Sequence, residues 1–331
     1  LGIDGYIIPK NDEYFGEYIS EYNDRLKHIS NFSGSFGFSL IIQDKNFLFV
    51  DGRYTLQAAE QSGKYFKIKT IPDETPKDIL KKKNLKIGFD PRLFTSKSLE
   101  YFFGKNKNNL IPINQNLVDK IWKRKKAKIL DKFYTLPKKS IGESFQTKVS
   151  KIIKILKKKD ADFQLITSSE NNAWLLNIRG GDSKYSPIPH SYILIDKKKR
   201  INFFCDLKKI TPSFKNKFKN IKFIKIDSIN KILSRISNKK FIIDKNTCSI
   251  FLETNIKRNN RIIDKNDSIY FLKAVKAKIE IDNIKKAHLY DGVALTKYLF
   301  WLKKNFNKKK ITEISAAKKL LNFRKKNKNF K

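Results

Sequence analysis

The sequence has 331 residues, of which 40% are hydrophobic and 26 are Phe, so it can bury apolar cores and is not a disordered chain. Its net charge is +40, with 62 Lys and only 10 Arg, and the Lys are spread over every segment. We interpret this composition as that of an AT-rich genome, with an acidic partner or a nucleic acid as alternatives. Because Arg supplies the bidentate contacts to base edges, its scarcity argues against a nucleic acid.

Four short apolar runs in the first third of the chain are predicted strands: Tyr6–Ile8, Phe38–Ile42, Phe47–Val50 and Ile87–Phe89. Four more begin 153 to 157 residues after them: Phe163–Thr167, Ser191–Ile195, Ile201–Cys205 and Phe241–Ile243. A stretch rich in Lys, Pro and Gly, residues 123–142, is predicted to link the two sets. The nearly constant offset indicates two copies of one α/β domain.

The pattern changes after Ile269, because apolar residues from Ala287 to Leu302 recur with a period near 3.6 and predict a helix of about six turns. Thr312, followed by Ser315, resembles the capping box that opens a second helix. Two helices without a strand cannot close a core, so we expect a third domain to begin here. The absence of Met and the charged C-terminal run lead us to expect a fragment of a longer protein.

The compartment is predicted from the cysteines and from hydropathy. Cys205 and Cys248 lie far apart and outside any CxxC pair, which favours reduced thiols in the cytoplasm. No apolar run approaches the ~20 residues that a membrane helix needs, so no membrane partner is expected.

Local motifs give no catalytic constellation. The three histidines, His28, His190 and His288, show no metal-ligand spacing; His288 and Asp291 stand three residues apart on one helix, where an ordinary polar role is the simpler interpretation. Residues 34–37 (GSFG) are interpreted as a tight loop before a strand rather than a nucleophile turn, and residues 179–182 (RGGD) are a weak ligand signal.

Three motifs in order carry a family resemblance. DGYIIPKNDEYFGEYI, NFSGSFGFSLI and FVDGRYTLQAAEQ resemble the N-terminal domain of long, three-domain Xaa-Pro aminopeptidases, which belong to the creatinase/prolidase-like metallopeptidases. ENNAWLLNIRGGDSKYSPIPHSYILI resembles their second domain. KAKIEIDNIKKAHLYDGVALTKYLFWL and ITEISAAKKLLNFR resemble the first helices of their catalytic domain.

The resemblance implies an α/β fold with two tandem creatinase-N-like domains, residues 1–122 and 123–270, and the start of a pita-bread catalytic domain, residues 271–331. It implies a cytoplasmic homodimeric enzyme with two manganese ions that removes the residue before proline from a peptide. The family's metal ligands would lie after Arg324, so no catalytic or metal residue is assigned here, and residues 1–331 alone are expected to be inactive and to bind no manganese. DGRY matches the motif whose arginine binds the peptide, which assigns substrate binding to Arg53.

Two other functions stay open at this point. A non-catalytic pita-bread protein, such as a histone-chaperone module, has the same domain order, and the charge of +40 would suit an acidic client. The intact DGRY motif argues against it. A creatinase-type or prolidase-type hydrolase would share the fold with another substrate, but the chain length and the second-domain motif favour the long aminopeptidase.

Overall fold

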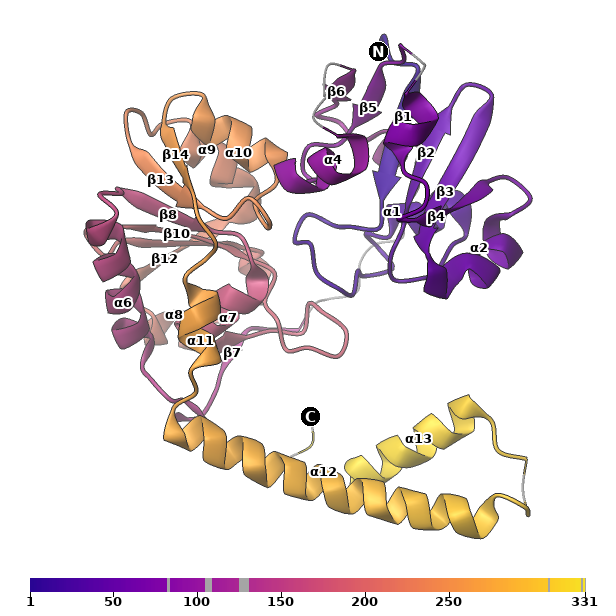
Figure 1. Ribbon diagram of the computed structural model, residues 1–331. Coiled ribbons are helices and arrows are strands. Elements are labelled where there is room, and N and C mark those ends of the chain that lie inside the picture. Colours follow the sequence, from indigo (N-terminus) through magenta and orange to yellow (C-terminus); the bar gives the residue numbers. More distant parts are fainter. Residues whose placement is uncertain (82–83, 105–108, 125–130, 309, 329, 331) are drawn as a thin grey trace. The chain divides into compact units, whose positions relative to one another are not determined.

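The computed structural model describes residues 1–81, 84–104, 109–124, 131–308, 310–328 and 330 (Figure 1). The chain divides into two compact units. The larger unit comprises residues 1–135 and 145–273 and contains two six-stranded sheets. The smaller comprises residues 136–144 and 274–331 and contains two long helices.

The first sheet has the strand order β4-β3-β2-β1-β5-β6. Its strands are β1 (Gly5–Pro9), β2 (Phe38–Ile42), β3 (Lys45–Asp51), β4 (Lys67–Ile71), β5 (Ile87–Phe89) and β6 (Leu110–Pro112). The helices of this part are α1 (Arg25–Ser30), η1 (Gly52–Tyr54), α2 (Thr55–Ser62), α3 (Pro76–Leu80), α4 (Ser96–Phe103) and α5 (Leu117–Ile121).

The second sheet has the order β12-β11-β10-β8-β13-β14. Its strands are β8 (Phe163–Ile166), β10 (Tyr192–Asp196), β11 (Ile201–Cys205), β12 (Ile221–Lys225), β13 (Lys240–Ile243) and β14 (Arg261–Asp264). Its helices are α6 (Phe145–Lys158), α7 (Ser169–Leu176), η3 (Leu207–Lys209), α8 (Pro212–Lys217), η4 (Ile226–Ser228), α9 (Ile229–Leu233), α10 (Ile250–Lys257) and α11 (Ile269–Ala274). A separate antiparallel pair joins β7 (Tyr134–Thr135) to β9 (Ile178–Arg179).

The two sheets have the same topology. In each, the first strand pairs antiparallel with the second and parallel with the fifth, and the second and third strands form an antiparallel hairpin. The edge strands pair parallel on both sides. The strands β3 and β11, which the sequence aligns at an offset of 154 residues, occupy equivalent places, so the predicted duplication is confirmed.

Each sheet buries both faces, because its central strands are apolar at nearly every position rather than at alternate ones. Phe47 and Phe49 of β3 pack on the side of α3 and α4, and Leu48 and Val50 pack on the side of α1 and α2. The second sheet is covered in the same way: Figure 1 shows α6 and α8 on one side of it and α9 and α10 on the other.

The predicted linker is partly wrong. Residues 125–130 of it lie outside the described residues. Its later part is folded, because Phe133 is 3% exposed and packs in the core of the second sheet, and β7 pairs with β9. The 3-10 helix η2 (Lys138–Ser140) belongs to the smaller unit. An aromatic residue among lysines was the sequence signal that Phe133 belongs to a core.

The first turn of α10 joins the second sheet to the first. The backbone N–H groups of Ile250 and Phe251 donate to the carbonyls of Phe94 and Pro91, each at 2.9 Å. The Arg92 guanidinium carbon lies 4.6 Å from the centroid of the Phe251 ring. The N–H groups that a helix leaves unpaired at its start are therefore satisfied by the other domain.

The smaller unit contains α12 (Lys278–Asn305) and α13 (Glu313–Arg324), which form a helical hairpin (Figure 1). Both predicted helices are confirmed. Thr312 is the N-cap of α13 and its side chain accepts a hydrogen bond from Ser315 N, so the predicted capping box is present. The two helices are joined by the ion pair of Arg324 with Asp291, at 2.6 Å.

Candidate functional site

Arg53 lies at the corner between β3 and α2. The strand ends at Asp51, whose Oδ1 accepts a hydrogen bond from Arg53 N at 3.0 Å and so caps η1. Asp is suited to this place because its short carboxylate bonds to the backbone two residues on. The turn is therefore built from the Asp51 side chain and the backbone.

The Arg53 guanidinium forms a bidentate pair with Asp51, with Nε 3.0 Å from Oδ1 and Nη2 2.7 Å from Oδ2. This hydrogen bonding lowers the pKa of the Asp51 carboxyl and raises that of Arg53. The Arg53 side chain is nevertheless 71% exposed, and Asp51 is its only hydrogen-bonding partner among the described residues. One edge of the guanidinium is thus held in place while the other is open to a ligand.

The neighbouring loop supports this corner. Ser35 Oγ lies 2.7 Å from the hydroxyl of Tyr54, and the guanidinium carbon of Arg53 lies 5.2 Å from the centroid of the Tyr54 ring. This contact supports the interpretation of residues 34–37 (GSFG) as a loop. A nucleophilic serine would contact a catalytic base, whereas Ser35 contacts the phenol of Tyr54. The loop fixes the ring against which Arg53 packs.

The second copy shows that the corner does not need an arginine. Asp206 directly follows β11 and caps η3 as Asp51 caps η1, because its Oδ1 accepts a hydrogen bond from Lys208 N at 3.0 Å. The position equivalent to Arg53 is Lys208, which has no ion pair with Asp206. Since the same turn forms there, turn formation alone does not account for a guanidinium at residue 53.

Sequence reasoning missed a buried polar cluster between the two sheets. The Tyr14 ring stacks on His190, with centroids 4.1 Å apart and an angle of 16° between the planes. The Tyr192 hydroxyl donates to the carbonyl of Glu13 at 2.5 Å. Asp12, next to them in sequence, is fully buried. Residues 10–14 of the first domain thus meet the start of β10 in the second.

The charges in this cluster are strongly perturbed by burial. Burial raises the pKa of Asp12 and lowers that of His190, while each charge partly offsets the shift of the other. Asp182 accepts a hydrogen bond from His190 N at 2.8 Å and forms a buried ion pair with Lys209. The contacts of Tyr14 with His190 and of Glu13 with Tyr192 connect the two domains. A histidine preceded by Pro and followed by Ser gave no sequence signal of them.

The weaker sequence candidates have structural roles. Gly180 and Gly181 of the RGGD stretch approach Phe133 and Asp131 so closely that a Cβ would not fit, so they pack against protein and leave no room for a ligand. His28 stacks on Trp122 at 4.5 Å. His288 Nδ1 lies 2.9 Å from the carbonyl of Ile284. Asp291 pairs with Arg324, in keeping with the ordinary polar role expected for His288 and Asp291.

Within the described part of the chain, no group of three or more His, Cys, Asp and Glu is placed to hold a metal ion. Cys205 and Cys248 are both buried and free. In the same residues, no helix is long and apolar enough to cross a membrane.

Comparisons with known proteins agree with the two sheets. Residues 1–121 match a model of the Creatinase/Prolidase N-terminal domain, and residues 123–280 match a second model with the same description. The chain therefore belongs to the family of creatinase/prolidase N-terminal domains, of which it contains two in tandem.

The most informative relatives are Xaa-Pro aminopeptidases. The chain is 32% identical to a probable Xaa-Pro aminopeptidase P of Aspergillus fumigatus, over 96% of this chain and 52% of that protein. It is 31% identical to the Xaa-Pro aminopeptidase ApepP of Drosophila melanogaster, over 98% of this chain and 55% of the relative. The chain thus spans about half the length of the curated relatives it matches.

A solved structure shows the same arrangement of elements. The crystal structure of X-prolyl aminopeptidase from Caenorhabditis elegans, described as a cytosolic enzyme with a di-nuclear active site, matches with a TM-score of 0.90 at 27% identity. The match covers 98% of this chain and 56% of that one. The family resemblance and the fold class predicted from the motifs are confirmed.

Proposed function

We propose that this chain is part of a metal-dependent Xaa-Pro aminopeptidase, which hydrolyses the peptide bond before a proline at the second position. The observation that carries the proposal is similarity along nearly the whole chain, 96–98% in the two relatives described, rather than in one domain. Those relatives are named as aminopeptidases, which favours this activity over a non-catalytic binding protein or a prolidase-type hydrolase.

The proposal includes domain boundaries at residues 1–122, 123–270 and 271–331, with the last range opening the catalytic domain. It also includes a cytoplasmic location, a homodimer and a proline-containing peptide as substrate. The C. elegans protein is described as cytosolic, which supports the location.

A di-nuclear metal centre does not fit the residues described here, because they contain no cluster of three metal-ligating side chains. We propose that the full-length protein holds two metal ions, manganese in our proposal, on residues outside this chain. The C. elegans enzyme has a di-nuclear site, which supports the number of ions. Residues 1–331 are proposed to contribute substrate contacts and no metal ligand.

The activity is tested by comparing the full-length gene product with this chain. With manganese supplied, we expect the full-length protein to release the first residue of Xaa-Pro peptides and to leave matched Xaa-Ala peptides intact. The purified chain of residues 1–331 should release no amino acid from either. Release by the chain alone would contradict the proposal, as would a full-length protein that ignores Xaa-Pro peptides.

We propose that Arg53 contacts the peptide substrate. Its open guanidinium edge can donate to a peptide carbonyl or carboxylate, and a planar fork of donors is geometrically better for this than an ammonium group. We expect Arg53→Lys in the full-length enzyme to lower kcat/KM for a proline peptide by about tenfold, the loss typical of a charged hydrogen bond. Thermal stability should be unchanged, since the ion pair is exposed.

Arg200→Lys is a matched control for Arg53→Lys. Arg200 also pairs with an aspartate, Asp196, and its side chain is 72% exposed. We expect this variant to keep wild-type kcat/KM. If Arg53→Lys leaves kcat/KM unchanged, Arg53 has only a structural role in the turn between β3 and α2. The aminopeptidase proposal would not be affected by that result.

A further inference from the structure

A concavity of about 650 Å³ lies at one end of the second sheet, where β13 and β14 begin and α10 ends. Its lining has five cationic side chains and no acidic one: Lys239, Lys240, Lys257, Arg258 and Arg261. The remaining lining residues are a serine and three asparagines. The concavity is shallow and open to solvent, and it is wide enough for a small anion.

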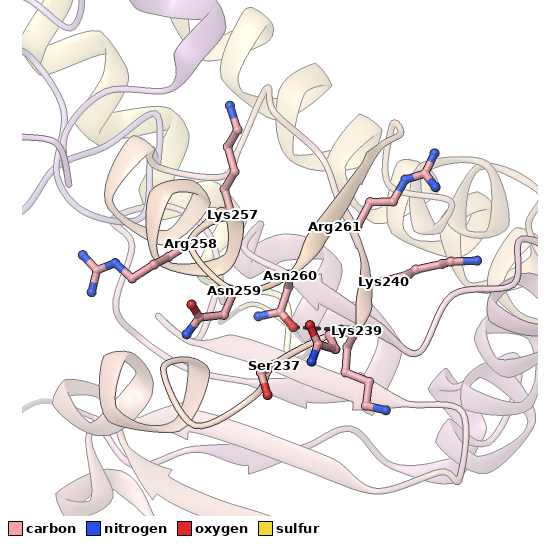
Figure 2. Close-up of a pocket in the computed structure, with 9 residues that line it drawn as sticks. Ser237, Lys239, Lys240, Lys257, Arg258, Asn259, Asn260 and Arg261 are labelled. Atoms are coloured by element: carbon pink, nitrogen blue, oxygen red, sulfur yellow. Dashed lines mark hydrogen bonds between the residues drawn. The ribbon is translucent and has the colours of Figure 1, made fainter.

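The floor of the concavity is held by Asn260. Its side chain accepts a hydrogen bond from Lys239 N at 3.1 Å and donates to the carbonyl of Ile236 at 2.7 Å. Figure 2 shows Ser237, Asn259 and Asn260 in the middle, with the cationic ends of the lysines and arginines pointing outward around them. The loops that carry these side chains are thereby tied together, although the cationic ends are separate.

The arginines show that this cationic cluster is more than a result of the high lysine content of the chain. Arginine is scarce in the chain, with 10 residues against 62 lysines. Seven of the ten hydrogen-bond through their side chains to a carboxylate or a carbonyl: Arg25, Arg53, Arg92, Arg124, Arg179, Arg200 and Arg324. The described residues provide no such partner for Arg235, Arg258 and Arg261. Two of these three line the concavity.

A structural role explains only part of the cluster. Lys257 and Arg258 lie at the C-terminal end of α10, where cations complement the helix dipole. Lys240 pairs with Asp160. Neither explanation covers Lys239 or Arg261, which lie at the starts of β13 and β14. Arg261 has no ion pair in the described part of the chain, and a bound anion would relieve the repulsion among these exposed cations.

We propose that this concavity binds a linear anion that carries several linked phosphate groups. Because the cationic ends point away from one another, one phosphate cannot reach several of them, whereas a chain of phosphates can extend across the floor. The lining contains no aromatic residue on which a nucleobase could stack, which disfavours single-stranded nucleic acid as the ligand. This site is separate from the Arg53 corner and independent of the proposed peptidase activity.

The test is calorimetric titration of the chain with tripolyphosphate at low ionic strength, beside orthophosphate and an oligouridine. We expect tripolyphosphate to bind at one site and orthophosphate to bind at least about tenfold more weakly, since fewer charged contacts are made. The double variant Arg258→Gln/Arg261→Gln should weaken tripolyphosphate binding by about tenfold or more.

The matched control is Lys154→Gln/Lys158→Gln, which removes the same charge from the exposed face of α6. It should bind tripolyphosphate as wild type does. Equal weakening by both double variants would show a response to net charge alone and overturn the proposal, as would oligouridine binding more tightly than tripolyphosphate. Circular dichroism melts confirm folding, and Lys239→Gln/Lys257→Gln is the second site variant if the arginine variant is unfolded.

Discussion

Replacing Arg25 with alanine is expected to lower the free energy of unfolding by about 3 kcal/mol, the loss typical when one partner of a buried ion pair is removed. The Arg25 side chain is 3% exposed, with Nε 2.8 Å and Nη2 2.9 Å from the two oxygens of Asp119. Nη2 also lies 2.7 Å from Glu13. Without the guanidinium, the partly buried carboxylates of Glu13 and Asp119 lose the positive charge that offsets their mutual repulsion.

The expected loss is measured by urea unfolding at neutral pH, with Lys27→Ala as the control. Lys27 lies on the same helix, α1, but its 3.8 Å pair with Glu21 is exposed, so its removal should cost less than about 0.5 kcal/mol. Arg25→Lys should fall between the two, because it keeps the charge and loses the bidentate geometry. A loss in Arg25→Ala no larger than in Lys27→Ala would show that the network contributes nothing.

Asp267→Asn is expected to flatten the pH dependence of stability by about 2 kcal/mol between pH 4.5 and 7.5. Burial raises the pKa of Asp267 from 3.8 to about 6. The folded state therefore binds this proton more tightly than the unfolded chain does. The resulting stabilisation is complete below about pH 4 and is lost as the pH rises through 6.

The substitution removes the titrating group and keeps the shape of the side chain. The Asp267 carboxylate accepts hydrogen bonds from Gln164 Nε2 at 3.0 Å and Ile269 N at 3.1 Å on Oδ1, and from Asn171 Nδ2 at 2.7 Å on Oδ2. The asparagine oxygen can replace Oδ1, so the bond from Asn171 is the one that is lost. Asp264→Asn, on the exposed end of β14, is the control and should leave the pH profile unchanged. A wild-type profile in Asp267→Asn would show that another group titrates in this range.

The sequence predicted the interior of both sheets and missed their edges. All eight predicted strands exist, because central strands with two buried faces are nearly continuous apolar runs. The four edge strands, β4, β6, β12 and β14, were missed. β4 reads KIKTI and β12 reads IKFIK, so lysines interrupt the apolar residues of both strands. Such edge strands are typical of natural sheets but resemble surface loops in a lysine-rich chain.

The sequence also predicted only part of the candidate functional residues. Arg53 was assigned from a motif, and the structure adds the bidentate pair with Asp51 and the exposed edge, while its contact with a peptide stays a prediction. The cluster of Asp12, Tyr14 and His190 was not predictable, because its members come from segments that are more than 170 residues apart. Only the packing of the two domains places Asp12 beside that imidazole.

The shared strand order has a consequence for folding fidelity. Tandem copies of one topology can exchange equivalent strands while they fold, a common failure of repeated domains. The fifth strands of the two domains, β5 and β13, differ in side-chain size at one buried position. Gly88 of β5 corresponds to Ile242 of β13, which is 1% exposed. A Cβ at Gly88 would lie 2.8 Å from Ile3 and 3.0 Å from Tyr6. If β13 entered the first sheet, its isoleucine would have to displace the side chains of Ile3 and Tyr6, so this glycine favours the pairing of each strand within its own sheet.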